Sequence, residues 1–118
     1  MSTTPQELRN RTKQFALRVV RLFRSLPKSP EAQVIGRQLL RSGTSVGANY
    51  RAACRARSRA EFVAKLGVVV EEADESAFWL ELLIETGTFK QEKVNNLLAE
   101  ALELTALFNA SRTTSKRR

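Results

Sequence analysis

The sequence predicts an all-α fold, an antiparallel up-down-up-down four-helix bundle. Three observations indicate it: apolar residues recur at spacings of three and four, capping signals divide the chain into four segments, and strand-like alternation is absent. The connections between segments are short, so neighbouring helices should run antiparallel. A chain of 118 residues fits one domain, which we place at residues 1–111.

The first helix is expected over residues 5–26. Thr4 and Glu7 form a capping box, and Pro5 stands at the first helical position, where its missing N–H costs no hydrogen bond. The sequence Pro-Lys-Ser-Pro at residues 27–30 ends this helix and starts the next. Its inward stripe consists of Leu8, Thr12, Phe15, Val19, Leu22 and Leu26.

The second helix is expected over residues 30–57. Gly36, Gly43 and Gly47 share one face, and a glycine costs a helix about 1 kcal/mol relative to alanine. The pattern allows either a kink at the last two glycines or a continuous helix with a groove for a close neighbour. We favour the continuous helix. Its inward face carries Ile35, Leu39, Ser42, Val46, Asn49 and Ala53.

Two further helices are expected over residues 59–86 and 89–110. Capping boxes begin both, Ser58 with Glu61 and Thr88 with Gln91, and Gly87 suits the position after the third helix. The basic tail, residues 112–118, has no periodicity and is expected to be disordered. The inward residues are Phe62, Leu66, Val69, Ala73, Leu80 and Leu83, followed by Val94, Leu97, Leu98, Ala101, Leu104 and Phe108.

The residue types exclude most catalytic chemistry. Histidine is absent and Cys54 is the lone cysteine, so Ser-His-Asp and Cys-His catalysis and Cys/His zinc sites have no candidates within one chain. We therefore expect no enzyme activity, no catalytic residue, no metal and no cofactor. No apolar run approaches the ~20 residues that span a bilayer, and the start does not resemble a signal peptide. These patterns favour a cytoplasmic protein without a membrane partner.

Charge is strongly polarised along the chain. Residues 1–60 hold 13 lysines and arginines against 2 acids, a net +11, whereas residues 61–111 hold 3 lysines against 10 acids, a net −7. The last seven residues add four positive charges, so the whole chain carries +8. Such polarity favours association with a polyanion, with a second copy, or with both.

Two separated stretches resemble a known family. Residues 40–53 read LRSGTSVGANYRAA, and FVAKLG, EEADE and FWLELL follow in order at residues 62–67, 71–75 and 78–83. They resemble the bacterial four helix bundle proteins, also called 23S rRNA intervening-sequence proteins, over residues 5–110. That family name reports a position within ribosomal RNA genes and no activity.

The family is in turn similar to the accessory variability protein of diversity-generating retroelements. That basic protein forms a pentameric ring of four-helix bundles and binds nucleic acid together with a reverse transcriptase. The resemblance implies a homopentamer here, with RNA or DNA and a reverse transcriptase or other nucleic-acid enzyme as partners. It carries over no catalytic residue.

Arginines supply the candidate nucleic-acid site. Several recur along one stripe of the second helix, with the small residues Thr44 and Ala48 between them, and others lie on the first helix. Guanidinium groups match phosphate oxygens, so the stripe favours sequence-independent backbone contacts. The alternatives are a solvated basic face or a face that pairs with acidic helices. The candidates are Arg11, Arg18, Arg21, Arg37, Arg41, Arg51 and Arg55.

Acidic residues at 71–85 could hold two metal ions, pair with a neighbouring subunit, or remain solvated. The dimetal design needs histidine, so we favour pairing between the acidic half of one copy and the basic half of the next. Asn49 is expected to bond across the bundle to Glu72 or Glu75, and Trp79 to belong to the core rather than to stack on bases. The expected structural and interface residues are Gly36, Gly43, Gly47, Asn49, Glu72, Glu75 and Trp79.

Together these patterns favour a non-enzymatic, oligomeric accessory protein that binds nucleic acid, RNA or an RNA–protein complex, through its first two helices. The alternative is an oligomeric scaffold or adaptor whose charge polarity serves self-assembly and protein docking without nucleic acid.

Overall fold

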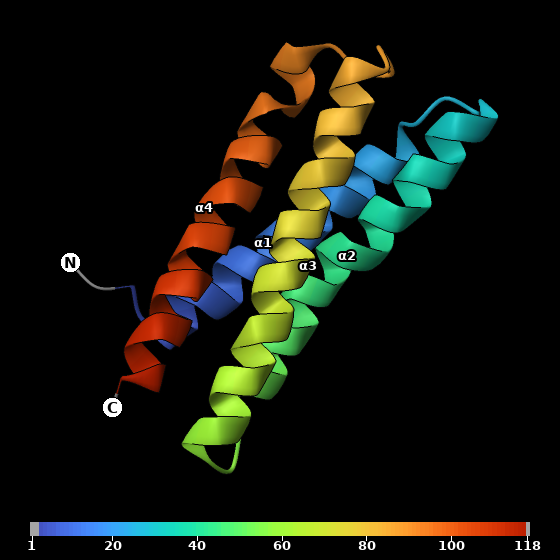
Figure 1. Cartoon of the computed structure of the whole chain (residues 1–118). Helices are drawn as coiled ribbons and strands as arrows, with labels where there is room; N and C mark the ends of the chain where they lie inside the picture. The colour runs from blue at the N-terminus through green and yellow to red at the C-terminus, as the bar shows by residue number, and fades with distance from the viewer. Residues whose placement is uncertain (1–2, 118) are drawn as a thin grey trace.

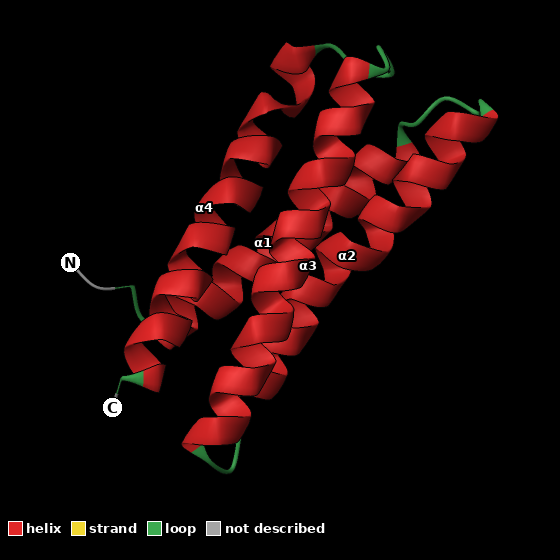
Figure 2. Cartoon of the chain, in the orientation of Figure 1, coloured by secondary structure: helices red, strands yellow, loops and turns green. Residues whose placement is uncertain are grey.

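The computed structural model describes residues 3–117, and four long helices make up almost all of that range (Figure 1). The helices pack side by side as an antiparallel bundle, and Figure 2 shows helix and loop but no strand in the described part. The bundle is elongated, with extents of 47 × 25 × 20 Å. The elements are α1 (Pro5–Arg24), α2 (Pro30–Cys54), α3 (Arg59–Glu85) and α4 (Gln91–Lys116).

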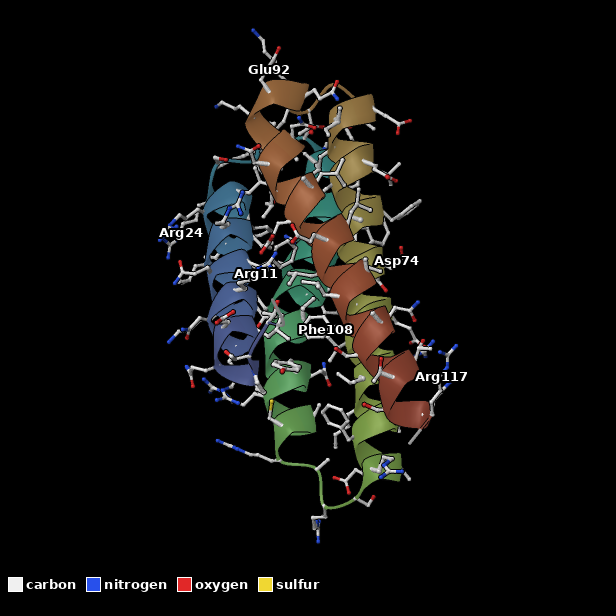
Figure 3. All side chains as sticks on the ribbon, turned by 90° about the vertical axis from the view of Figure 1, so that its left-hand side faces the viewer. Arg11, Arg24, Asp74, Glu92, Phe108 and Arg117 are labelled. Atoms are coloured by element: carbon white, nitrogen blue, oxygen red, sulfur yellow. The ribbon has the colours of Figure 1, made fainter. Side chains whose placement is uncertain are left out.

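The core follows the predicted stripes closely. One continuous cluster runs the length of the bundle, and its largest fully buried side chains come from all four helices. Phe108 of α4 packs its ring against Tyr50 of α2, with centroids 4.8 Å apart (Figure 3). Among the predicted inward residues, Leu22, Phe62, Leu98 and Asn49 are only half-buried.

Side-chain caps begin α1 and α3 as predicted. Thr4 accepts a hydrogen bond from the Glu7 N–H, and Ser58 accepts one from the Glu61 N–H, both at 3.1 Å. The third predicted box is wrong, because α4 begins after Lys90 and no side chain caps it. Thr88 instead meets the Thr86 hydroxyl at 2.9 Å.

Gly87 adopts φ +74°, the left-handed conformation expected just after α3. Its N–H donates to the Ile84 carbonyl, and the Phe89 N–H donates back to the Leu83 carbonyl. These bonds turn the chain towards α4. The left-handed backbone explains why glycine stands at this position.

The glycine-bearing α2 is continuous, which confirms the favoured prediction. A Cβ at Gly43 would lie 2.8 Å from a methyl of Val19, and one at Gly47 would lie 3.3 Å from the Thr12 hydroxyl. Both neighbours belong to α1. The absent side chains therefore let α1 and α2 approach each other closely.

The helices differ from the predicted bounds mainly at their ends. The first two stop earlier, at Arg24 and Cys54, each followed by a tighter turn of i to i−3 hydrogen bonds. The predicted disordered tail is wrong as far as Lys116, because α4 continues to that residue. Hydrogen bonds from Arg112 and Thr113 to Asn109 support the extra turns, and Arg112 also lies over Gly67 of α3. Residue 118 lies outside the described range.

Within the described residues, no helix is long and apolar enough to cross a membrane.

Candidate nucleic-acid interface

Arg11 does not lie free on the basic face. It lies on the side of α1 that faces α4, where its guanidinium meets the Glu100 carboxylate at 2.7 Å and that of Glu103 at 3.3 Å (Figure 3). The hydrogen bond to Glu100 is the main reason that the pKa of Arg11 is raised. Because α1 and α4 otherwise pack sparsely, this ion pair is a principal link between them.

Arg41 is likewise paired inside the chain. Its guanidinium reaches the Glu72 carboxylate at 3.3 Å and also contacts Glu75, both on α3. The charge of Glu72, followed by that of Glu75, raises the pKa of Arg41. The Trp79 indole N–H donates to Glu75 at 3.1 Å. Glu72, Glu75 and Trp79 therefore serve the α2–α3 contact within one copy.

The predicted hydrogen bond from Asn49 across the bundle is wrong. Asn49 donates instead to the Ser45 carbonyl of its own helix at 2.8 Å. The polar contact across the bundle is made by Ser42 of α2 and Ser76 of α3, whose hydroxyl oxygens are 2.9 Å apart. Asn49 lies on the edge of the inward stripe, so Tyr50 takes the buried position beside it.

A groove runs along the opposite side of α2, where α1 packs against it. The hollow has a volume of about 300 Å³. Helix α1 supplies cationic side chains to one wall and α2 to the other, while the tight contact between Thr12 and Gly47 lies within it. The lining residues are Arg9, Thr12, Lys13, Ala16, Thr44, Gly47, Ala48 and Arg51.

A second hollow extends this groove towards the end of α2. Arg9, Arg51, Cys54 and Arg55 line it, and its volume is about 470 Å³. Because Arg9 and Arg51 line both hollows, the two form one surface feature, which we call the α1–α2 groove. Its lining includes four cationic side chains and no carboxylate.

The groove contains only some of the predicted arginines. Arg51 and Arg55 line it, whereas Arg18, Arg21 and Arg37 lie outside it, and Arg11 and Arg41 are paired with α4 and α3. The sequence interpretation missed Arg9 and Lys13. They directly follow the inward residues Leu8 and Thr12, on the flank of α1 that meets the glycine-bearing face of α2. That spacing was the available signal.

Acidic charge gathers on α3, away from α1. In Figure 3, Asp74 of α3 and Arg24 of α1 lie at opposite edges of the bundle. Four acidic side chains of α3 are exposed, and the ring of Phe78 beside them is 49% exposed. No group of three or more potential metal ligands forms among the described residues. The exposed acids are Glu71, Asp74, Glu81 and Glu85.

Comparisons with known proteins agree with this architecture. A crystal structure at 1.70 Å of a protein with unknown function from the S23 ribosomal protein family of Bacteroides thetaiotaomicron is 36% identical. The alignment covers 92% of this chain and 97% of that one, with a TM-score of 0.85. No curated protein matches the chain. The family model of the 23S rRNA-intervening sequence protein matches residues 6–110, and the chain therefore belongs to that family.

Proposed function

We propose that this chain is a non-enzymatic accessory protein that binds nucleic acid, RNA or an RNA–protein complex, through the basic side formed by α1 and α2. The observation that carries the proposal is the α1–α2 groove, where cationic side chains from two helices converge without a carboxylate among the lining residues. Phosphate contacts of this kind give affinity that does not depend on sequence.

The proposal includes assembly into a homo-oligomeric ring, a pentamer, with a reverse transcriptase or another nucleic-acid enzyme as a further partner. Polarised charge supports the assembly, because the exposed acids of α3 on one copy complement the basic side of the next. A head-to-tail contact of this kind closes into a ring when the rotation between copies permits.

A scaffold or adaptor that binds no nucleic acid is the second candidate. The ion pairs of Arg11 and Arg41 favour it, because both join the basic first half of the chain to its acidic second half. The same pairing between copies would use the remaining arginines for assembly. In that case their charges would serve contacts between subunits rather than phosphates.

Fluorescence anisotropy with a labelled structured RNA, over roughly 50 to 300 mM salt, tests the first candidate. We expect tight binding at low salt and a steep loss of affinity as salt rises, since each neutralised phosphate releases counterions. Absent or salt-independent binding contradicts the proposal. Arg37→Glu combined with Arg51→Glu separates the two candidates, because it weakens RNA binding in the first and breaks the oligomer in the second. Light scattering measures the mass.

A further inference from the structure

We infer that the α1–α2 groove is the site where the backbone of one single strand of nucleic acid is bound, with its bases directed away from the protein. This inference rests on the proposed function and narrows it to one site and one class of ligand. The groove, rather than the basic surface as a whole, makes the decisive contacts.

Charge placed on both walls is the first argument. Arg9 and Lys13 come from α1, and Arg51 and Arg55 come from α2, so a phosphate in the groove meets cations from two sides. Elsewhere the cations are more scattered or are neutralised, as Arg11 is by Glu100. Two-sided contact favours a single backbone that follows the groove over a duplex, whose phosphates lie on a wide convex surface.

The depth and length of the groove form the second argument. Gly47 and Ala48 leave the α2 wall low between its arginines, and Thr12 beneath them is buried. From Thr44 to Arg55 the α2 wall extends about 16 Å at 1.5 Å per residue. The groove is thus long enough for several consecutive phosphates, and its four cations can contact up to four of them.

The lining also predicts how the bases behave. It contains no aromatic side chain, and the nearby Tyr50 is buried against Phe108. The exposed ring of Phe78 lies on α3, outside this groove. Stacking platforms are what give single-strand binders their base-dependent energy. Binding should therefore depend on phosphate charge and hardly on base identity.

The test measures anisotropy of labelled oligo(U), oligo(A) and an RNA duplex, each of about 12 nucleotides, a length within the range that single-strand sites cover. Lys13→Gln with Arg51→Gln removes one charge from each wall of the groove. Arg21→Gln with Arg24→Gln is the matched control, because it removes two exposed charges from α1 outside the groove.

We expect the groove variant to lose at least about tenfold in affinity and the slope of log affinity on log salt to fall by about 1.4, or about 0.7 per phosphate. The control variant should stay within about threefold of the wild type, oligo(U) and oligo(A) should bind alike, and the duplex should bind more weakly. Equal losses in both variants, or tighter duplex binding, overturn the groove site while leaving nucleic-acid binding intact. Failure of the unmodified protein to bind any of the three overturns both.

Cys54 provides a second readout without any engineering. It is the one cysteine of the chain, it is exposed, and it lines the groove. Saturating oligo(U) should slow its alkylation by iodoacetamide, followed by mass spectrometry. An unchanged alkylation rate at saturation places the strand elsewhere and overturns the inference. A changed oligomer mass in the groove variant alone also overturns it, because the cations would then serve a contact between copies.

Discussion

The hydroxyl groups of Ser42 and Ser76 meet 2.9 Å apart in the middle of the bundle, and neither residue has exposed surface. Each is also within reach of a backbone carbonyl of its own helix, Leu39 for Ser42 and Glu72 for Ser76. This contact is a small polar link between α2 and α3 inside an otherwise apolar core. Its geometry fixes both the register and the separation of the two helices.

Removal of one hydroxyl should therefore have a modest effect. We expect Ser76→Ala to lower the free energy of unfolding by about 1 kcal/mol, because its partner keeps a carbonyl acceptor. The double variant with Ser42→Ala should cost less than the sum of the two single changes. Urea denaturation measures all three. Strict additivity would contradict a direct hydroxyl–hydroxyl interaction.

The glycines of α2 and α3 should respond to alanine in opposite directions. Gly43→Ala brings a methyl within 2.8 Å of Val19 in the core, so we expect a net destabilisation of about 1–3 kcal/mol. Gly67→Ala meets only the flexible end of Arg112, at 3.3 Å, and should gain up to about 1 kcal/mol of helix propensity. Thermal unfolding compares the two. Equal effects would contradict the close packing of α1 on α2.

Tyr50 should make the fold sensitive to alkaline pH. Burial raises the pKa of its hydroxyl, and the neighbouring Cys54 raises that pKa further, while Arg9 lowers it. The unfolded chain releases this proton near pH 10, before the folded chain does, so the free energy of unfolding falls as pH rises above about 10.

Tyr50→Phe separates this effect from the titration of lysines. The variant should lose less stability between about pH 9 and pH 11 than the unmodified protein, as measured by urea midpoints. Identical pH dependence in the two proteins would show that Tyr50 does not contribute.

Trp79 should report on the Arg41 network. It is the one tryptophan of the chain, and its N–H donates to Glu75, which Arg41 also contacts. Arg41→Gln should shift the tryptophan emission while RNA affinity stays within about twofold, because the charge of Arg41 is already neutralised by two carboxylates. Unchanged emission, or a large loss of RNA binding, contradicts that arrangement.

Periodicity and capping signals predicted most of the fold because both act locally. The inward stripe from Leu8 to Val19, the caps at Thr4 and Ser58, and the turn at Gly87 each depend on residues within one or two helical turns. The failures share the opposite property. Asn49 and Tyr50 are adjacent near the edge of one stripe, and only the approach of Phe108 from α4 selects Tyr50 for burial.

The candidate site was harder to predict for the same reason. Arg41 and Arg51 occupy similar positions in the sequence pattern, yet one lies on the α3 flank of the helix and the other on the α1 flank. A sequence shows which residues share a helix face but not which neighbour stands beside its edge. Arg9 and Lys13 join the site only because the glycines of α2 bring α1 next to it.

The close contact of α1 with Gly47 has a consequence for how this surface can change over evolution. Substitution of Lys13 or Arg55 alters the charge of the groove without moving either helix, since both side chains are exposed. A side chain at Gly47 would press on Thr12 and separate the walls, so every cation would shift together. The affinity of the groove can therefore drift one charge at a time, whereas its width depends on an uncharged position.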